Sequence, residues 1–455
     1  MPDGADGCVC VTDKSTETRN RKEKKKQAVG ETCPWGVENP PFTREMKETY
    51  TILSPDIFPI HMRLIAEIFH MYGYNLEILR SRGRQVIQCG LEHIHNDMCY
   101  PAICMCGQQL YALTSGEYDP HKCALIQFQT GGGCRASNYI WMLRKALHNM
   151  GMDDVPVLSL SFNRVEKKSG FRVTPMMLAK GLVAVIYGDM LMLLKNQVKP
   201  YEANPGDTDR VLDKWYAELT SQMKRNRGLF GRSLARNLRA IAEDFHNVQR
   251  RDVKRTKVGI VGEIYVKYSA FGNNGLEEFL ESQGCEYMVP GVFPFFQFMF
   301  DCQLADREFY GDGTRRASAL SKFGAALARR FERTFRKALE PYPEFVVPST
   351  FAELRRLGEK NIGRGVKMGE GWLLPAEIAE LIEHGYNNVI CVQPFGCLPN
   401  HIVGKGVVRT LRETYPNANI CPVDYDAGAS KVNQENRIKL MLAVSEEKDD
   451  ETTGD

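Results

Sequence analysis

The sequence predicts an α/β protein with parallel, doubly wound sheets and a layer made only of helices. Short apolar runs alternate with amphipathic stretches from about residue 50 to residue 162, which favours a parallel sheet. Between Thr174 and Val253 the pattern changes to helices alone, and alternation then returns as far as residue 445. A chain of 455 residues that is 43% hydrophobic exceeds the usual size of one core, so we expect more than one domain.

The first α/β region follows a polar, charged segment, residues 1–48, that holds few apolar positions and is typical of a disordered tail. Strands are expected at Tyr50–Leu53, Leu76–Leu79, Ala124–Phe128 and Val155–Phe162, with helices at His61–Tyr72 and Arg135–Met150. The segment 49–170 is therefore predicted to be the first α/β domain.

The segment 171–255 is predicted to be a helical layer or insert, with helices at Met176–Lys195, Asp207–Met223 and Ser233–Asn247. The segment 256–445 is predicted to be a second α/β domain, and 446–455 a frayed acidic tail. Its strands are expected at Lys257–Val266, Tyr287–Val292, Asn388–Gln393 and Ile420–Asp424, and its helices at Asn274–Ser282, Ser318–Leu339, Pro375–His384, Gly404–Tyr415 and Lys431–Val444.

The helix expected at Ser318–Leu339 has an apolar stripe surrounded by basic residues. The stripe consists of Leu320, Phe323, Leu327, Phe331 and Phe335. We expect it to pack against the body of the protein. The alternative is a face for an anionic partner, and the basic runs Arg329–Lys337 and Arg21–Lys26 would then favour nucleic acid.

Overall charge and hydropathy argue against two classes of partner. The 59 basic and 56 acidic residues give a net charge of only +3, which does not indicate a dedicated nucleic-acid binder. The longest apolar stretches, such as Met176–Ile186, are interrupted before the roughly 20 residues that span a bilayer. With no secretory signal at the N-terminus, we expect no membrane partner and a cytoplasmic location.

Fourteen cysteines in such a chain are best interpreted as reduced thiols. No Cys-x-x-Cys pair occurs, so any metal site must be assembled by the fold. Most cysteines that lie in apolar segments are expected to be small buried hydrophobic residues; these are Cys89, Cys123, Cys285, Cys302 and Cys391.

Three cysteines differ from the others because each lies in a turn that is expected to open a helix. They are Cys99 before Tyr100-Pro101, Cys134 after Gly131-Gly132-Gly133, and Cys397 between Gly396 and Leu398-Pro399. A helix start favours a thiolate over a thiol, and the thiolate is the form that binds metal. Cys134 and Cys397 also follow predicted strands, so we expect one shared metal site.

Three thiolates without an obvious fourth leave one coordination position open, which suits a reactive centre. Cys104, about one helical turn after Cys99, is the candidate for an additional ligand or is merely packed.

Other residues near these turns suggest supporting roles. Gly131, Gly132 and Gly133 either cradle a phosphate or let an inorganic cluster lie against the backbone, and Gly396 has the same second role. His401 either delivers a proton or caps backbone groups. Glu263, directly after a predicted strand, either faces a cleft between domains or bonds a helix start.

Together these motifs resemble iron–sulfur proteins related to the 2-hydroxyacyl-CoA dehydratase subunits, and most closely the C-terminal region of large CoA-enzyme activases. The resemblance covers roughly residues 50–445. It is carried by Asn96–Pro101, Thr130–Tyr139, Val258–Val266 with Glu263, and Gln393–His401.

The resemblance implies a [4Fe-4S] cluster held by Cys99, Cys134 and Cys397 between flavodoxin-like, Rossmann-like domains. It further implies a low-potential electron received from a separate ATP-hydrolysing activator and passed to a bound acyl-CoA or small-molecule substrate, in a homo- or heterodimer. The chain would then act as a dehydratase-like lyase or as a reductase component. The alternatives are a larger double-cubane cluster, for which Cys104, Cys106, Cys302 and Cys391 are further thiols, and a non-catalytic metal-binding scaffold or regulatory subunit.

Overall fold

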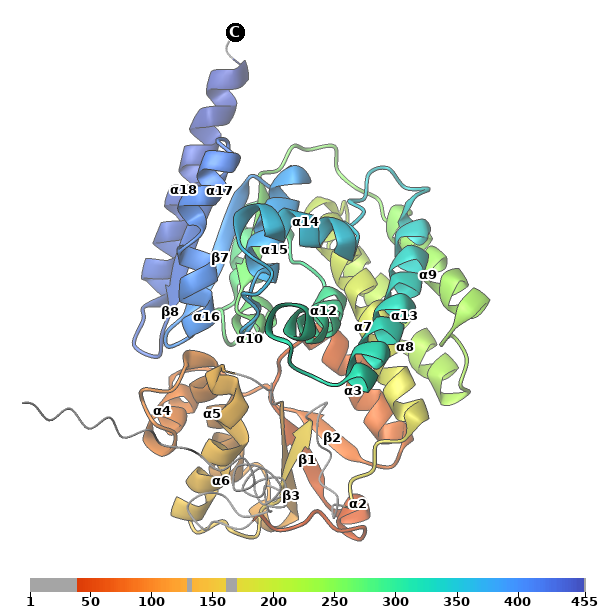
Figure 1. Cartoon of the computed structure of the whole chain (residues 1–455), viewed down its shortest axis with the longest axis vertical. Helices are drawn as coiled ribbons and strands as arrows, with labels where there is room; N and C mark the ends of the chain where they lie inside the picture. The colour runs from red at the N-terminus through yellow and green to blue at the C-terminus, as the bar shows by residue number, and fades with distance from the viewer. Residues whose placement is uncertain (1–38, 129–132, 161–169, 454–455) are drawn as a thin grey trace, which may run out of the picture.

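The protein contains two four-stranded, all-parallel sheets, each flanked by helices (Figure 1). A computed structural model describes residues 39–128, 133–160 and 170–453. The predicted α/β fold class, with parallel sheets of the flavodoxin or Rossmann type, is confirmed. The strand orders, β2-β1-β3-β4 and β6-β5-β7-β8, are equivalent, so the chain repeats one topology.

The first sheet contains the four strands predicted before residue 170. They are β1 (Thr51–Ser54), β2 (Asn75–Ile78), β3 (Cys123–Phe128) and β4 (Val157–Leu160). The α-helices of this unit are α2 (Met46–Thr49), α3 (Pro59–Met71), α4 (Arg84–His93), α5 (Tyr100–Thr114) and α6 (Tyr139–Asn149). Ile52 of the central strand pairs with Leu76 on one side and Ala124 on the other.

Residues 39–48, assigned to the tail from the sequence, already belong to this unit. Phe42 is buried, and the Asn39 side chain exchanges two hydrogen bonds with the backbone of Val157 in β4. The remainder of the predicted tail, residues 1–38, lies outside the described residues.

A layer of three helices joins the two units. The helices are α7 (Pro175–Val198), α8 (Asp207–Lys224) and α9 (Gly231–His246). Contrary to our expectation, the stretch Pro175–Tyr201 is long and apolar enough to cross a membrane by length and composition. However, 78% of its most apolar window is buried inside the fold, which is consistent with a core helix of a soluble protein.

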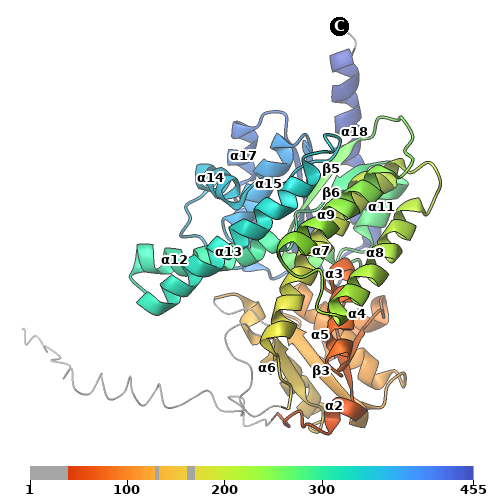
Figure 2. The same ribbon diagram turned by 90° about the vertical axis from the view of Figure 1, so that its right-hand side faces the viewer.

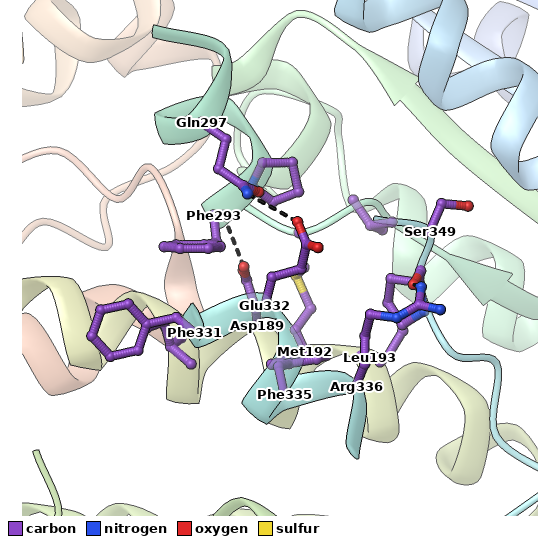
Figure 3. A pocket seen from close by; sticks show the side chains of 15 residues that line it. Asp189, Met192, Leu193, Phe293, Gln297, Phe331, Glu332, Phe335, Arg336 and Ser349 are labelled. Atoms are coloured by element: carbon purple, nitrogen blue, oxygen red, sulfur yellow. Dashed lines mark hydrogen bonds between the residues drawn. The ribbon is translucent and has the colours of Figure 1, made fainter. Parts of the chain in front are cut away.

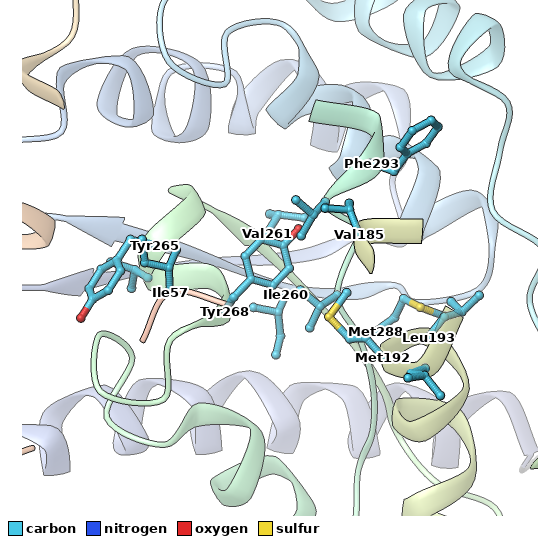
Figure 4. Close-up of a cluster of buried hydrophobic side chains, with 14 of the residues drawn as sticks. Ile57, Val185, Met192, Leu193, Ile260, Val261, Tyr265, Tyr268, Met288 and Phe293 are labelled. Atoms are coloured by element: carbon cyan, nitrogen blue, oxygen red, sulfur yellow. The ribbon is translucent and has the colours of Figure 1, made fainter. Parts of the chain in front are cut away.

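Helix α7 is buried because both units pack on it. It contacts α3 of the first unit and β6 of the second. Figure 4 shows the resulting core, in which Val185 and Met192 of α7 lie with Ile260 and Val261 of β5 and with Met288 of β6.

The second sheet contains β5 (Lys257–Gly262), β6 (Glu286–Met288), β7 (Asn388–Pro394) and β8 (Asn419–Tyr425). Its helices are α10 (Ile264–Tyr268), α11 (Leu276–Ser282), α12 (Phe293–Tyr310), α13 (Arg315–Leu339), α14 (Phe351–Asn361), α15 (Leu373–Glu383), α16 (Leu398–Asn400), α17 (Val408–Thr414) and α18 (Lys431–Thr453), with a π-helix at His401–Lys405.

Several predicted boundaries in this unit are wrong. The strand expected at Tyr287–Val292 ends at Met288, and the helix expected at Gly404–Tyr415 begins only at Val408, after the π-helix. The strand expected at Lys257–Val266 stops at Gly262, whose φ of +131° turns the chain, and Glu263 caps α10. The acidic tail is not separate, because α18 continues through 446–453. Residues 431–453 contain no glycine or proline, so nothing in the sequence ends α18 before Gly454.

Helices α12 and α13 form a hairpin that projects from the body of the protein (Figure 2). The prediction that the apolar stripe of α13 packs against the body holds for only half of it. Phe331 is buried and Phe335 partly buried, whereas Leu320 and Phe323 are 70% and 69% exposed and Leu327 is also exposed. The stripe extends along the projecting part of the helix, where no other element covers it in the described chain.

Candidate functional site

Two of the predicted cysteine turns, those of Cys134 and Cys397, follow strands at the topological switch points of the two sheets, whereas the Cys99 turn lies between α4 and α5. In the first sheet the switch point separates β1 from β3, and Cys134 follows β3. In the second it separates β5 from β7, with Glu263 after β5 and Cys397 after β7. Ligands of open α/β sheets bind at this position. Figure 1 shows the end of the second unit that carries α10 and α16 facing α4 and α5 of the first.

Direct contacts bring the turns together. The backbone N–H of Tyr100, next to Cys99, donates to the carbonyl oxygen of Phe395 at 2.9 Å. Arg135, next to Cys134, donates from Nη1 to the carbonyl oxygen of Asp97 at 2.7 Å. Gly396 fits against both, since a Cβ there would lie 2.5 Å from Arg135 Nη1 and 3.0 Å from Cys99 Cα. Segments far apart in the sequence therefore form one site.

Each of the three cysteines precedes a helical segment, as predicted. Cys99 caps α5, and its Sγ lies 2.8 Å from the Tyr139 hydroxyl. Cys134 caps the 3₁₀ helix Arg135–Asn138, and its Sγ accepts a hydrogen bond from the Ala136 N–H at 3.5 Å. Cys397 precedes α16. Cys99 and Cys397 are buried, and Cys134 is partly buried.

The expectation that these positions favour thiolates is wrong for the protein without a bound cation. Burial raises the pKa of Cys99 to about 11 and raises the pKa values of Cys134 and Cys397 as well. The charges of Glu263 and Glu370 add to the rise for Cys134 and Cys397. Desolvation of the charged form therefore outweighs the helix start.

Two buried carboxyl groups adjoin the cysteines. Glu263 Oε2 accepts the Val266 N–H and Glu370 Oε1 accepts the Ile264 N–H, both at 2.9 Å, so both carboxyls cap α10. Burial, together with the Glu370 charge, raises the pKa of Glu263 to about 8. Burial also raises the pKa of Glu370. Of the two alternatives for Glu263, the bond to a helix start is confirmed. Its carboxyl also interacts electrostatically with all three thiols.

Sequence reasoning missed a fourth segment of the site, residues 366–371. Besides Glu370, it supplies Met368, whose Sδ accepts the Gly133 N–H at 3.3 Å. Gly369 lies so close to Pro399 that a Cβ would be 2.9 Å from the proline Cβ. The available signal was the glycine spacing around Glu370, since Gly369 and Gly371 both adopt positive φ.

The remaining predicted site residues make few contacts with the cysteine turns or lie outside the described residues. His401 is partly exposed, and its backbone N–H donates to Cys397 O at 3.2 Å. Within the described residues its imidazole has no hydrogen-bond partner. Cys104 is fully buried inside α5. Gly131 and Gly132 lie outside the described residues.

No group of three or more His, Cys, Asp or Glu side chains in the described part of the chain is arranged to hold a single metal ion. In a cubane cluster each thiolate binds a different iron. The cysteines that hold it are therefore farther apart than the ligands of a single metal ion. Cys134 interacts electrostatically with both Cys99 and Cys397, so the three thiols lie near one another, and thiolates are the ligands that such a cluster takes. Beside them Asn400 is fully buried, and both polar atoms of its side chain lack a partner in the described residues.

A cavity of about 70 Å³ lies elsewhere, among α7, α12 and α13 (Figure 3). Its walls are mainly apolar, and the polar groups seen there are already bonded: Gln297 donates to Glu332 at 2.9 Å, and Asp189 accepts the Phe293 N–H at 2.8 Å. None of its lining residues belongs to the cysteine turns.

Comparison of the sequence with protein-family models and with curated proteins finds no match. The case for a function therefore rests on the residues and geometry described above.

Proposed function

We propose that Cys99, Cys134 and Cys397 hold a [4Fe-4S] cluster and that the chain passes low-potential electrons from a separate ATP-hydrolysing activator to a bound substrate. The observation that carries the proposal is the contact of the Cys99 turn with the Cys134 and Cys397 turns, which follow the switch-point strands of the two sheets. The sequence resemblance to 2-hydroxyacyl-CoA dehydratase subunits and CoA-enzyme activases supports the same proposal.

The electrostatics of the site favour a cationic group. Burial raises the pKa values of the thiols and of Glu263 more than the hydrogen bonds they accept lower them. Iron ions would stabilise the negative charge of the thiolates, as bound metals deprotonate coordinating thiols. When bound, such a cluster supplies one-electron transfer at a potential set by burial and hydrogen bonds. Gly396 allows the close approach of the turns, and Asn400 offers a buried amide beside Cys397.

Two residues are proposed to handle protons. Glu263, with a pKa of about 8, would hold a proton near neutral pH at the edge of the cysteine site. His401 follows Cys397 by one helical turn and has a partly exposed, unbonded imidazole among the described residues. It would exchange protons between solvent and a bound substrate, which we propose to be an acyl-CoA or a small molecule.

The surface around the site supports docking of the activator. Met368, Phe395, Leu398 and Ile402 expose large apolar side chains beside the cysteine turns, and we call these four residues the apolar rim. Exposed apolar groups that cluster in this way mark interaction surfaces. An electron donor must come close to the cysteines, so the activator is the occupant we propose. A homo- or heterodimer and a cytoplasmic location complete the proposal.

Anaerobic purification, with iron, sulfide and zinc counted per chain, tests the cluster. We expect about four irons per chain, lost in the single variants Cys99→Ser, Cys134→Ser and Cys397→Ser. Cys285→Ser, a buried cysteine outside the turns, is the control and should retain iron. Zinc alone, or unchanged iron in all three variants, would contradict the proposal. About eight irons would instead favour the double cubane.

Electron transfer is tested separately by adding the activator and ATP and following the cluster by electron paramagnetic resonance. We expect ATP-dependent reduction. An iron-loaded protein that never accepts an electron would instead be the non-catalytic scaffold or regulatory subunit.

A further inference from the structure

A second polar cavity lies apart from the cysteine site, where the ends of α3 and α8 meet the start of α7. It is an open cavity of about 460 Å³. Its lining consists of His70, Met71, Tyr72, Lys180, Lys224 and Asn226. None of these residues belongs to the cysteine turns, and no acidic side chain lines the cavity.

Lys180 is the unusual member of this group. It is only 4% exposed, which is rare for a lysine without a paired carboxylate. Its Nζ lies 4.0 Å from Met71 Sδ and 5.1 Å from the centre of the Tyr72 ring. Among residues 39–128, 133–160 and 170–453, no carboxylate forms an ion pair with it. Burial of an ammonium group without a counter-ion is costly, so the position favours a ligand with negative charge.

The opposite side of the cavity supplies further donors. Lys224, the last residue of α8, is exposed and forms no ion pair within the described chain. Asn226 adopts a φ of +55° where α8 ends, and it is one of the residues that line the same cavity. The positive φ belongs to the helix end, because the Asn226 N–H donates to Met223 O at 3.0 Å. The Asn226 side chain is exposed and forms no hydrogen bond with the described residues.

Both ring nitrogens of His70 already have partners. Its Nε2 lies 3.0 Å from Leu76 O, and its Nδ1 lies 3.6 Å from Glu67. The charge of the cavity therefore comes from the two lysines, one buried and one exposed.

We propose that this cavity binds a small phosphate-bearing ligand, with Lys180 as the buried counter-charge and Lys224 and Asn226 as further donors. Lysine binds phosphate as a point charge, whereas planar carboxylates are better matched by the paired N–H groups of arginine, and no arginine lines the cavity. The Tyr72 ring and Met71 provide an apolar wall for the remainder of a phosphate ester. The ligand site is independent of the proposed cluster.

Isothermal titration of the full chain with inorganic phosphate, and separately with glycerol phosphate, tests the proposal. We expect saturable binding that Lys180→Met weakens about tenfold or more and that Lys224→Met weakens less, because Lys224 is solvated. Methionine keeps the apolar stem of Lys180, so the variant should unfold at the wild-type temperature or above it. Lys431→Met, on α18 away from the cavity, should bind like the wild type.

Three results would overturn the proposal: no saturable phosphate binding, unchanged binding by Lys180→Met, or equal affinity for succinate at matched ionic strength. Sedimentation with vesicles that contain phosphatidic acid separates the two sources of phosphate. Soluble phosphate should compete with any vesicle binding, and binding to vesicles alone would also overturn the proposal.

Discussion

The backbone N–H of Tyr100 donates to the carbonyl oxygen of Phe395 at 2.9 Å, and this bond joins the turn of Cys99 to the turn of Cys397. It links the start of α5 in the first unit to the end of β7 in the second. The bond uses main-chain atoms, so the relative position of the two turns depends on how closely their backbones approach. Gly396 belongs to the Cys397 turn and lies against the backbone of Cys99, so its lack of a side chain allows the two turns to come this close.

Gly396→Ala should therefore separate the cysteine turns. The φ of +71° would cost an alanine about 1 to 2 kcal/mol, and its Cβ would in addition meet Arg135 and the backbone of Cys99. Gly313→Ala is the matched control, because Gly313 has a φ of +91° with no atom within 4 Å of a built Cβ. We expect both variants to lose stability in thermal unfolding, but only Gly396→Ala to lose iron. Equal iron contents would contradict this role of Gly396.

Asp189 of α7 connects the helical layer to both α/β units. Its Oδ1 bonds His61 Nε2 of α3 at 2.8 Å and accepts the Val292 N–H at 2.7 Å, while its Oδ2 accepts the Phe293 N–H at 2.8 Å. Asp189→Asn should destabilise the protein by about 3 kcal/mol or more, because an amide N–H₂ would face backbone donors. Asp213→Asn removes an exposed ion pair with Arg63 and should cost less than about 1 kcal/mol in chemical unfolding.

The fold was largely predictable, because most of the eight strands coincide with short apolar runs bounded by turns. β3, for example, begins one residue before its predicted start, and β7 ends one residue after its predicted end. α12 was not predicted, since its phenylalanines at 293, 295, 296, 298 and 300 follow no helical period. The strand predicted through Val266 failed because a single glycine, Gly262, turns the chain.

The candidate site was predictable in part. The helix-start positions of Cys99, Cys134 and Cys397 follow from local sequence, and the places of Cys134 and Cys397 at the carboxyl ends of their sheets follow from the parallel topology. The raised pKa values of their thiols could not be predicted from local sequence, because they result from burial, and burial depends on how the two units assemble. Glu370 was missed for the same reason, since it reaches the site from a loop that follows α14.

Asp56, directly after β1, should make stability depend on pH. Burial raises its pKa from 3.8 to about 6, so the folded protein binds this proton more tightly than the unfolded chain does. The stability it contributes is complete below about pH 4 and is lost as the pH rises to about 6, by at most about 1.4 kcal/mol per pH unit. The Asp56→Asn variant has no carboxyl at this position, so its stability lacks this dependence on pH.

We therefore expect Asp56→Asn to gain stability relative to the wild type between pH 4 and pH 6, with a constant difference above pH 6. Chemical unfolding at several pH values measures the difference. A difference that does not change with pH would show that the carboxyl titrates normally.

Leu398→Ser tests whether the apolar rim receives the proposed activator. Leu398 is 64% exposed beside Cys397, so its loss should change the free energy of unfolding by less than about 0.5 kcal/mol and leave the iron content intact. Activator-dependent reduction should nevertheless slow about tenfold, because apolar side chains at the centre of an interface carry much of its binding energy. Leu440→Ser is the control: Leu440 is 68% exposed on α18, away from the cysteine turns, and this variant should be reduced at the wild-type rate. Equal rates for the two variants would place the activator on another surface, whereas a loss of iron in Leu398→Ser would assign the effect to the cysteine site instead of docking.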